Sequence, residues 1–446
     1  DIFTQALFPP PLIPNLDQHI WWGDVYHGIE DESIVPYEIK FNTKGIQKLL
    51  HKLKHRENFT QPLKNSAMTY GMNTNFLNII LDYWLHRYDF VKRQDRLNLY
   101  PQFRTKIQGL NLHFIHIKPK VHSHKKVIPL LLLHGWPVTN MEYFKVIPKL
   151  LEERKEKDFV FEIIAPTIPG FGYSEGTSKI GLAPYQIGII FKNLMKRLGY
   201  DQFYIHGGDF GEAIGSDMAV LYQEDILGFH TNFPFSLLPQ TLIKYLLGAL
   251  HPPAVVQPKY TERMYPLCRV LYKEINCFIF LTDIAIFDSP SGLAAWILTV
   301  MTWASNPNNV FHDDGRLLKT YNIDDLLDIL TIIWDSECIM TATRIYAEFT
   351  AVFQDPVTLK MLWSPTEVLY AAIKFRHEII YQPDDFLRDK YKNLVHSTTI
   401  DFGGHFAAHE NPDLLMKMNH ASDSSNDDDD SEVDDDRFSK AAESLY

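Results

Sequence analysis

Apolar and polar positions follow two different periods along this chain. Four segments have apolar residues at three- and four-residue spacings, which predicts helices over 43–57, 73–95, 141–152 and 185–198. An alternating run predicts a strand at 113–117. Three short apolar runs are typical of strands buried in a parallel sheet, at 128–133, 160–165 and 203–206. Because strands and helices alternate, the pattern predicts a mostly parallel, doubly wound α/β sheet.

The pattern changes after residue 234. Residues 235–355 are mostly helical in pattern, and strand-like runs return at 368–375 and 395–401. This predicts one α/β core interrupted by a helical cap. We therefore expect five segments: an N-terminal extension wrapping the core (1–100), the first part of the core (101–234), the cap (235–355), the second part of the core (356–420) and an acidic tail (421–446).

The amino-acid composition is typical of a folded protein, and most of the net negative charge lies near the C-terminus. The protein has 446 residues, of which 46% are hydrophobic, enough for a substantial core. Residues 421–446 contain ten acids and two bases, so this segment carries −8 of the total formal charge of −12 and leaves −4 for residues 1–420. A nearly neutral body gives no indication of nucleic-acid binding. The Ser/Asp/Asn-rich tail is predicted to be disordered.

Cysteine usage and hydropathy bound the cellular context. Cys268, Cys277 and Cys338 are too few for a disulfide framework, and their spacing matches no zinc pattern, which predicts a reduced, cytosol-facing protein without a metal. No run of 18 apolar residues predicts a transmembrane helix. Because the first residue is Asp and not Met, we expect a processed or truncated chain from which a targeting segment is missing.

A glycine-rich turn around Asp209 carries the sharpest chemical signal. The motif Gly207-Gly208-Asp209-Phe210-Gly211 follows a buried strand and precedes a helical pattern. This is the strand–turn–helix context of a nucleophile elbow, here with Asp in place of the usual Ser. By itself the motif is more often a plain glycine-rich turn.

Two further motifs follow strands at places that matter in the same fold. His134-Gly135-Trp136-Pro137 stands where an oxyanion-hole loop is expected, and Gly403-Gly404-His405-Phe406 stands where a catalytic histidine is expected. Their order and spacing together predict an α/β-hydrolase fold with a helical cap and an Asp nucleophile.

The motifs together resemble the microsomal epoxide hydrolases and, within them, the insect juvenile hormone epoxide hydrolases. The similarity runs from about residue 20 to about residue 415. It is carried by eight stretches: Trp21 to Gly23, Tyr100 to Lys118, His134 to Pro137, Pro166 to Gly172, Phe203 to Gly211, Asp288 to Ala295, Glu378 to Pro383 and Gly403 to Ala408.

Chemistry and resemblance together suggest the roles of the candidate residues. An epoxide has no carbonyl, so a carboxylate such as Asp209 can open it by attack at carbon and form an ester that water cleaves. His405 would activate that water as general base. Glu378 is the favoured acid to orient His405, with Asp401 as a rival. The backbone N–H groups of Trp136 and Phe210 would form the oxyanion hole.

Ring opening also needs a proton donor to the epoxide oxygen, and the resemblance implies two cap tyrosines for it. Tyr346, in Arg344-Ile345-Tyr346, matches one of them. The position of the other falls on Cys277, and Tyr272 is out of register. Since a thiol does not replace a phenol, this departure predicts reduced turnover or an altered epoxide preference.

The sequence thus predicts an enzyme that hydrolyses lipophilic epoxides, with juvenile hormone as the favoured natural substrate and xenobiotic epoxides as the broader class. The chemistry needs water and no cofactor or metal. Two alternatives stay open: a haloalkane dehalogenase-like hydrolase, and a catalytically weak protein that binds a lipid hormone. The resemblance also implies association with the endoplasmic reticulum membrane, through an N-terminal anchor absent from this chain.

Overall fold

The computed structural model describes residues 9–24, 30–121, 124–153, 158–266, 288–350 and 354–415. Its centre is a nine-stranded sheet in the order β1-β2-β3-β5-β4-β6-β7-β8-β9. The strands have these bounds: β1 Val35–Tyr37, β2 Gln102–Ile107, β3 Leu110–Ile117, β4 Lys126–Leu133, β5 Phe159–Pro166, β6 Phe203–Gly207, β7 Ile226–Thr231, β8 Thr366–Lys374 and β9 Tyr391–Thr399. Pairing is antiparallel from β1 to β3 and between β3 and β5, and parallel from β5 to β9.

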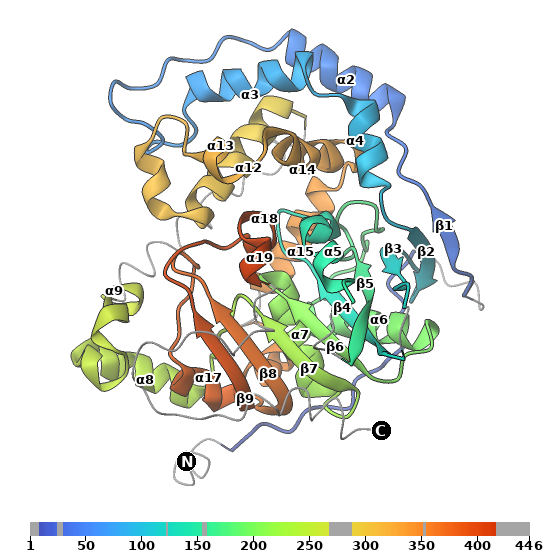
Figure 1. The fold of residues 1–446 in the computed structure, drawn as a ribbon, viewed down its shortest axis with the longest axis vertical. Helices are drawn as coiled ribbons and strands as arrows, with labels where there is room; N and C mark the ends of the chain where they lie inside the picture. Colours follow the sequence, from blue (N-terminus) through green and yellow to red (C-terminus); the bar gives the residue numbers. More distant parts are fainter. Residues whose placement is uncertain are drawn as a thin grey trace.

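Helices surround this sheet and form a second layer above it (Figure 1). The α-helices have these bounds: α2 Thr43–Lys54, α3 Thr74–His86, α4 Phe90–Leu97, α5 Ile147–Leu150, α6 Pro184–Arg197, α7 Phe210–Leu221, α8 Pro239–Leu250, α9 Thr261–Met264, α12 Pro290–Ser305, α13 Leu317–Thr320, α14 Ile323–Ser336, α15 Ile339–Thr350, α16 Pro356–Leu362, α17 Asp384–Lys390, α18 Ala407–Glu410 and α19 Pro412–Leu415. The predicted α/β-hydrolase fold with a mostly parallel sheet is confirmed.

Strand β4 shows why this sheet is covered on both faces. Its alternate residues Leu131 and Leu133 belong to the apolar core shared with α6 and α7. Leu130 and Leu132 belong to a second core on the opposite face, shared with α5 and α18. Successive strand residues point to opposite faces, so the continuous apolar run seen in the sequence is the pattern of a strand buried on both sides.

The N-terminal helices pack on the helical layer above the sheet. Helices α2, α3 and α4 lie against α12 and α14 (Figure 1). The buried Arg93 guanidinium pairs with Asp325 at 2.9 Å and donates from Nε to Asp328 at 2.8 Å, and Trp84 Nε1 donates to Thr331 at 3.1 Å. Helices α2, α3 and α4 therefore pack on other helices, whereas β1, which precedes them in the chain, pairs with the sheet.

Two of the predicted helices differ from the observed ones. The segment 73–95 is two helices, because Asp89 caps a new helix by accepting from the Lys92 N–H at 3.1 Å. The segment 141–152 is a 3₁₀ helix, Asn140–Lys145, followed by the short α5. Pro148 lies in the first turn of α5, where its missing N–H costs no helical hydrogen bond.

Strands β1, β2 and β7 were not predicted. β1 and β2 extend the sheet beyond β3 by antiparallel pairing, and β7 lies between β6 and β8. β1 is an edge strand, and it has fewer apolar contacts to fix its pattern than a central strand, so its sequence signal is weaker.

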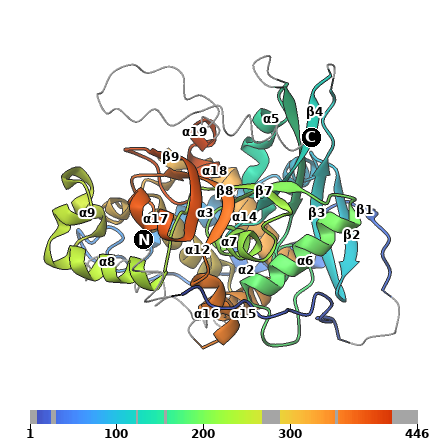
Figure 2. The same cartoon turned by 90° about the horizontal axis from the view of Figure 1, so that it is seen from below.

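The described part of 235–355 is helical, as its pattern predicted, and it lies in two places. Helices α12, α13 and α14 belong to the layer above the sheet, and α15 runs from that layer toward the sheet, whereas α8 and α9 lie beside α17 (Figures 1 and 2). Thr241 and Lys244 on α8 contact the Asp389 carboxylate at 2.7 and 2.8 Å.

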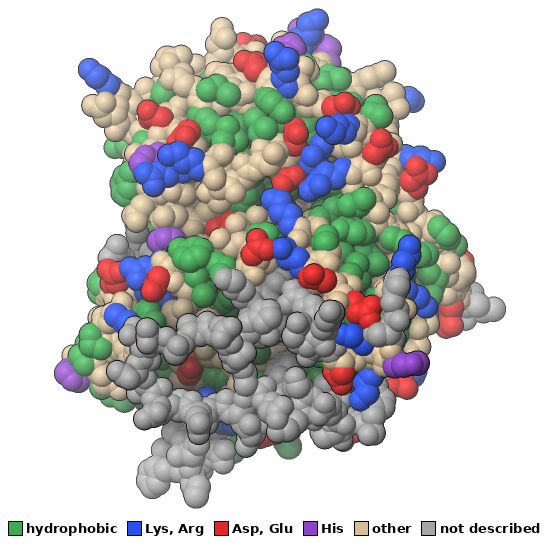
Figure 3. Space-filling model, viewed as in Figure 1, with side chains coloured by type: hydrophobic (Ala, Val, Ile, Leu, Met, Phe, Trp, Pro, Cys, Tyr) green, Lys and Arg blue, Asp and Glu red, His purple; other side chains and the backbone are tan. Residues whose placement is uncertain are grey.

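The described surface carries mixed charge. Basic and acidic side chains are interspersed over the face shown in Figure 3, as expected for a body with little net charge. Among the described helices, none combines the length and apolar character needed to cross a bilayer.

Candidate active site

Asp209 stands at a sharp turn between β6 and α7. Its φ of 51° is unusual for a residue with a side chain and marks a strained backbone of the kind found at nucleophile elbows. The glycines around it permit the turn. A Cβ at Gly207 would lie 2.3 Å from the Gly211 carbonyl oxygen, and one at Gly211 would lie 2.0 Å from the Leu133 carbonyl oxygen. The predicted strand–turn–helix context is therefore what the chain adopts.

The loop after β4 brings a backbone donor to Asp209. The Trp136 N–H donates to Asp209 Oδ1 at 2.8 Å. His134 holds this loop in place, because its Nε2 accepts from the Ile168 N–H at 2.9 Å. Burial lowers the pKa of His134 to about 4, so the ring is neutral and can accept that bond.

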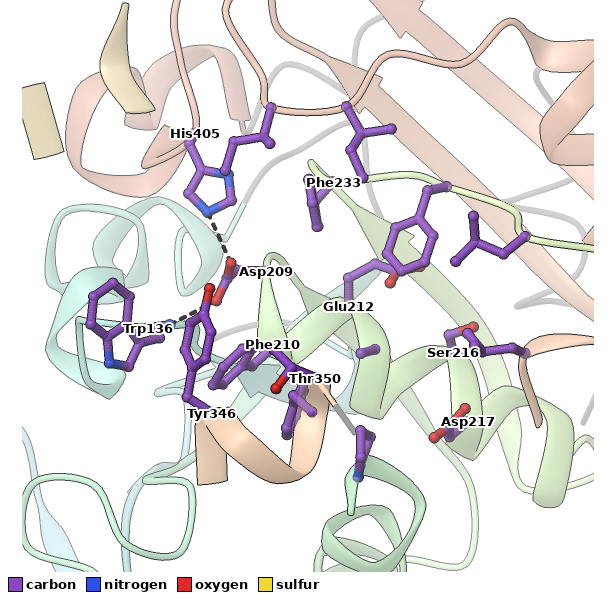
Figure 4. Close-up of a pocket in the computed structure, with 18 of the residues that line it drawn as sticks. Trp136, Asp209, Phe210, Glu212, Ser216, Asp217, Phe233, Tyr346, Thr350 and His405 are labelled. Carbon is purple, nitrogen blue, oxygen red and sulfur yellow. Dashed lines mark hydrogen bonds and ion pairs between the residues drawn. The ribbon is translucent and has the colours of Figure 1, made fainter. Parts of the chain in front are cut away.

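His405 lies between two carboxylates. Its Nε2 is 3.1 Å from Asp209 Oδ2, and its Nδ1 is 2.5 Å from Glu378 Oε1 (Figure 4 for Asp209). Glu378, which follows β8, is buried, whereas the rival Asp401 is exposed. Glu410 positions the histidine loop by accepting from the Gly404 N–H at 2.9 Å.

The two carboxylates control the protonation of His405. Burial by itself would lower the pKa of the imidazole, but the charges and hydrogen bonds of Glu378 and Asp209 raise it well above its ordinary value. The two carboxylates therefore favour the protonated form of His405 and an ion pair between its Nε2 and Asp209.

Tyr346 and Phe210 line a largely apolar cavity of about 280 Å³ next to these groups. The Tyr346 ring packs against Trp136 and Phe210, at centroid distances of 5.4 and 5.3 Å. Figure 4 shows the Tyr346 hydroxyl directed toward Asp209. Phe210 is the first residue of α7, where backbone N–H groups have no acceptor within the helix.

The structure thus brings the predicted residues together at one end of the cavity. They come from five different stretches of chain, as follows: Trp136, Asp209 with Phe210, Tyr346, Glu378 and His405. Cys277, at the second tyrosine position, and the acidic tail lie outside the described residues. Cys338 is a buried free thiol.

Several polar residues near the cavity were not predicted from the sequence. Glu212 and Asp217 on α7, and Lys390 at the end of α17, line it beyond Asp209. Glu142 lines a smaller cavity, of about 20 Å³, that also contacts Asp209 and His405. One signal could have revealed residues of α7: Asp209, Glu212 and Ser216 are polar at three- and four-residue spacing along an otherwise largely apolar segment.

Family comparisons agree with this geometry. Residues 34–143 match the family model of the epoxide hydrolase N terminus, and residues 128–248 match that of the alpha/beta hydrolase fold. The chain is 43% identical to the juvenile hormone epoxide hydrolase of Manduca sexta over 93% of this chain and 91% of that protein. It is 36% identical to epoxide hydrolase 1 of Oryctolagus cuniculus, over 89% and 90%.

A solved structure supports the same relationship. The crystal structure of juvenile hormone epoxide hydrolase from the silkworm Bombyx mori superposes with a TM-score of 0.86 at 38% identity, covering 90% of this chain and 97% of that one. The protein is therefore an enzyme, a hydrolase, and it belongs to the microsomal-type epoxide hydrolase family, which includes the juvenile hormone epoxide hydrolases.

Proposed function

We propose that this enzyme converts lipophilic epoxides to diols through a covalent ester on Asp209. The main support for the proposal is the position of the Asp209 carboxylate and its contacts. One oxygen accepts from the Trp136 N–H, the other faces His405, and the group lines a largely apolar cavity together with Tyr346. An apolar wall favours a lipophilic substrate.

In the first step an Asp209 oxygen attacks an epoxide carbon. A carbon–oxygen bond to the carboxylate forms, and the strained carbon–oxygen bond of the ring breaks. The Tyr346 hydroxyl, directed toward Asp209, gives its proton to the released ring oxygen. The products of this step are an ester on Asp209 that carries one free hydroxyl, and a Tyr346 phenolate.

Ester formation also prepares His405 for the second step. The negative charge of Asp209 is one of the groups that raise the His405 pKa, and the ester removes that charge. His405 can then lose its proton, which restores the Tyr346 hydroxyl directly or through solvent. A neutral imidazole oriented by Glu378 is able to act as a base.

In the second step water attacks the ester carbonyl as His405 takes its proton. The backbone N–H groups of Trp136 and Phe210 stabilise the oxyanion. His405 passes the proton to the departing diol oxygen, and the new Asp209 carboxyl group then protonates His405. Epoxide and water are consumed, one diol is released, and the Asp209–His405 ion pair is restored.

The natural substrate belongs to the same proposal. The Manduca sexta and Bombyx mori relatives are named for juvenile hormone, so we infer that compound as the favoured substrate and other lipophilic epoxides as the broader class. Association with the endoplasmic reticulum membrane stays a prediction of the family resemblance.

A single turnover in heavy-oxygen water tests the ester route. With enzyme in excess over a lipophilic epoxide, the proposal expects heavy oxygen in the peptide that contains Asp209 and none in the diol. Asp209→Asn, compared under the same conditions, should form no diol at an early time. Heavy oxygen in the first diol would mean that water attacks the epoxide directly. Tight binding without diol formation by the wild type would favour a binding protein.

A further inference from the structure

The loop that carries His405 is held along its backbone by groups outside the loop. The N–H groups of Gly404 and Phe406 donate to the two carboxylate oxygens of Glu410, at 2.9 and 3.1 Å. Between them, the His405 N–H donates to the Ala304 carbonyl oxygen at 3.1 Å. Glu410 is the last residue of α18, and Ala304 lies in the last turn of the cap helix α12. One carboxylate and one cap helix therefore fix the backbone on both sides of the imidazole.

The loop also lies directly against the end of α12. A Cβ at Gly404 would lie 2.2 Å from the Ser305 carbonyl oxygen, so glycine permits an approach that a side chain would block. Ala304, whose carbonyl oxygen accepts from His405, also lines the main cavity. The end of α12 thus contacts both the substrate cavity and the histidine loop.

A tyrosine of the cap contacts the same carboxylate. Tyr321, which follows α13, is buried, and its hydroxyl donates to Glu410 Oε1 at 3.0 Å. Ser305 Oγ, at the end of α12, lies 2.5 Å from Tyr321 Oη. Helices α12 and α13 belong to the layer above the sheet, whereas α18 follows the last strand (Figure 1). Glu410 therefore joins two cap helices to the loop that carries His405.

Burial and hydrogen bonding have opposite effects on Glu410. Burial raises its pKa to about 7, whereas the hydrogen bonds from Tyr321, Phe406 and Gly404 favour the ionised form. The ionised form can accept at both oxygens, and hydrogen bonds to a carboxylate are stronger than those between neutral groups. By favouring that charge, Tyr321 strengthens the bonds between Glu410 and the loop.

We propose that Glu410 and Tyr321 are positioning residues for His405, and that they act on hydrolysis of the ester and not on ring opening. Ring opening uses Asp209 and Tyr346, which the loop does not carry. Hydrolysis needs His405 Nε2 close to the water that attacks the Asp209 ester. A displacement of about 1 Å in such an arrangement can cost about 10²-fold in rate. This inference rests on the proposed function, because it concerns the second step of that reaction.

Single turnovers that follow the ester on Asp209 test this division of roles. In Glu410→Gln, one of the two loop N–H groups faces an amide NH₂ instead of an oxygen. Ring opening should stay within about twofold of the wild-type rate, whereas ester decay should slow by about 10- to 100-fold. Equal slowing of both steps, or ester decay at the normal rate, would overturn the proposal.

Steady-state kinetics separate positioning from general damage. When ester decay alone is slowed, ester accumulates, and kcat and KM should fall together. A variant that merely contains less folded enzyme would lower kcat and leave KM unchanged, and that result for Glu410→Gln would also contradict the proposal.

Tyr321→Phe tests the contribution of the cap. The variant loses one hydroxyl and keeps the carboxylate, so ester decay should slow by about threefold to tenfold, less than in Glu410→Gln. Combined with Glu410→Gln it should add little, because both residues act through the same contact. Normal ester decay in Tyr321→Phe would remove the cap from the proposal. If Glu410→Gln does not fold, this variant still decides.

A second tyrosine–glutamate pair provides the matched control. Tyr200 Oη donates to Glu162, which is buried on β5, and in the part of the chain that the structure describes neither residue lines the main cavity. Glu162→Gln and Tyr200→Phe should change neither step, and slower ester decay in both would overturn the assignment to Glu410. Failure of the proposed function would look different, since neither the wild type nor Glu410→Gln would then carry an ester on Asp209.

Discussion

Asp209 and Glu212 are acids three residues apart that line one cavity, yet their surroundings differ. Both Asp209 oxygens contact groups from other elements, the Trp136 N–H and the His405 ring. Glu212 receives one hydrogen bond, from Tyr391, and burial raises its pKa to about 8. The contacts made by neighbouring strands and loops thus distinguish the two acids, and they support the proposal that Asp209, and not Glu212, is the nucleophile.

The largest expected effect comes from replacing Asp209 by Asn, and the comparison is the replacement of Glu212 by Gln. Asp209→Asn removes the attacking oxygen, so kcat/KM for a hydrocarbon epoxide should fall by about 10⁴-fold or more. Glu212→Gln, measured with the same substrate, should lower it by less than about tenfold. Similar losses in the two variants would remove the distinction between the two acids.

Loss of the Glu378 carboxylate, which contacts His405 Nδ1, should have the next largest effect on turnover. Glu378→Gln should lower kcat by about 10³-fold, because the imidazole loses its orienting carboxylate. The same change removes a charge that raises the His405 pKa, so the acid limb of the pH profile of kcat should move to lower pH. The control is Asp401→Asn at the exposed rival acid, which should match the wild type. An unshifted acid limb in Glu378→Gln would be evidence against the His405 assignment.

Loss of the proton donor should have a smaller effect. Tyr346→Phe should slow ester formation by about 10²-fold in stopped-flow single turnovers, since ring opening loses general-acid assistance. Hydrolysis of the ester should be unaffected. Tyr83→Phe, on the distant α3, removes a hydroxyl hydrogen-bonded to Asp324 and should change neither step. If the variant opened the ring at the normal rate but hydrolysed the ester more slowly, the proposed role of Tyr346 in ring opening would be wrong.

The last expected effect is on stability and not on rate. The pKa of Glu212 is about 8 in the folded protein and 4.5 ordinarily, so the folded state keeps this proton to higher pH than the unfolded state. Its contribution to stability is complete below pH 4.5 and is lost as the pH rises toward 8, by about 1.4 kcal/mol per pH unit. Denaturant unfolding should therefore show wild type losing stability relative to Glu212→Gln over this range. Parallel curves would mean that Glu212 ionises normally.

Most of the proposed catalytic residues could be located from the sequence because they follow strands in recognisable motifs. Tyr346 lies on helix α15 and was assigned from the family resemblance. Asp209 follows an apolar run and His405 follows a strand-like run, and the parallel sheet brings the ends of those strands to one edge. Of the two acids considered as partners of His405, Glu378 is buried and contacts the imidazole, whereas Asp401 is exposed. No local sequence pattern reveals this difference.

The polar end of the cavity could not be predicted in the same way. Lys390 lies 178 residues after Glu212 in the printed sequence, and only the folded chain places both on one wall. The packing of α3 and α4 on α12 and α14 was likewise hidden, because it depends on the buried contacts of Arg93 with acids more than 200 residues away. Long-range pairs of this kind have no periodicity to detect.

The central claim is that Asp209 forms an ester that His405 helps to cleave. The most direct measurement is the intact mass of the His405→Gln variant after reaction with a lipophilic epoxide, followed by peptide mapping. The account predicts that the variant gains the full mass of the epoxide, located on Asp209, and releases diol slowly. A variant that gains no mass while still forming diol, or that carries the added mass on another residue, would contradict it.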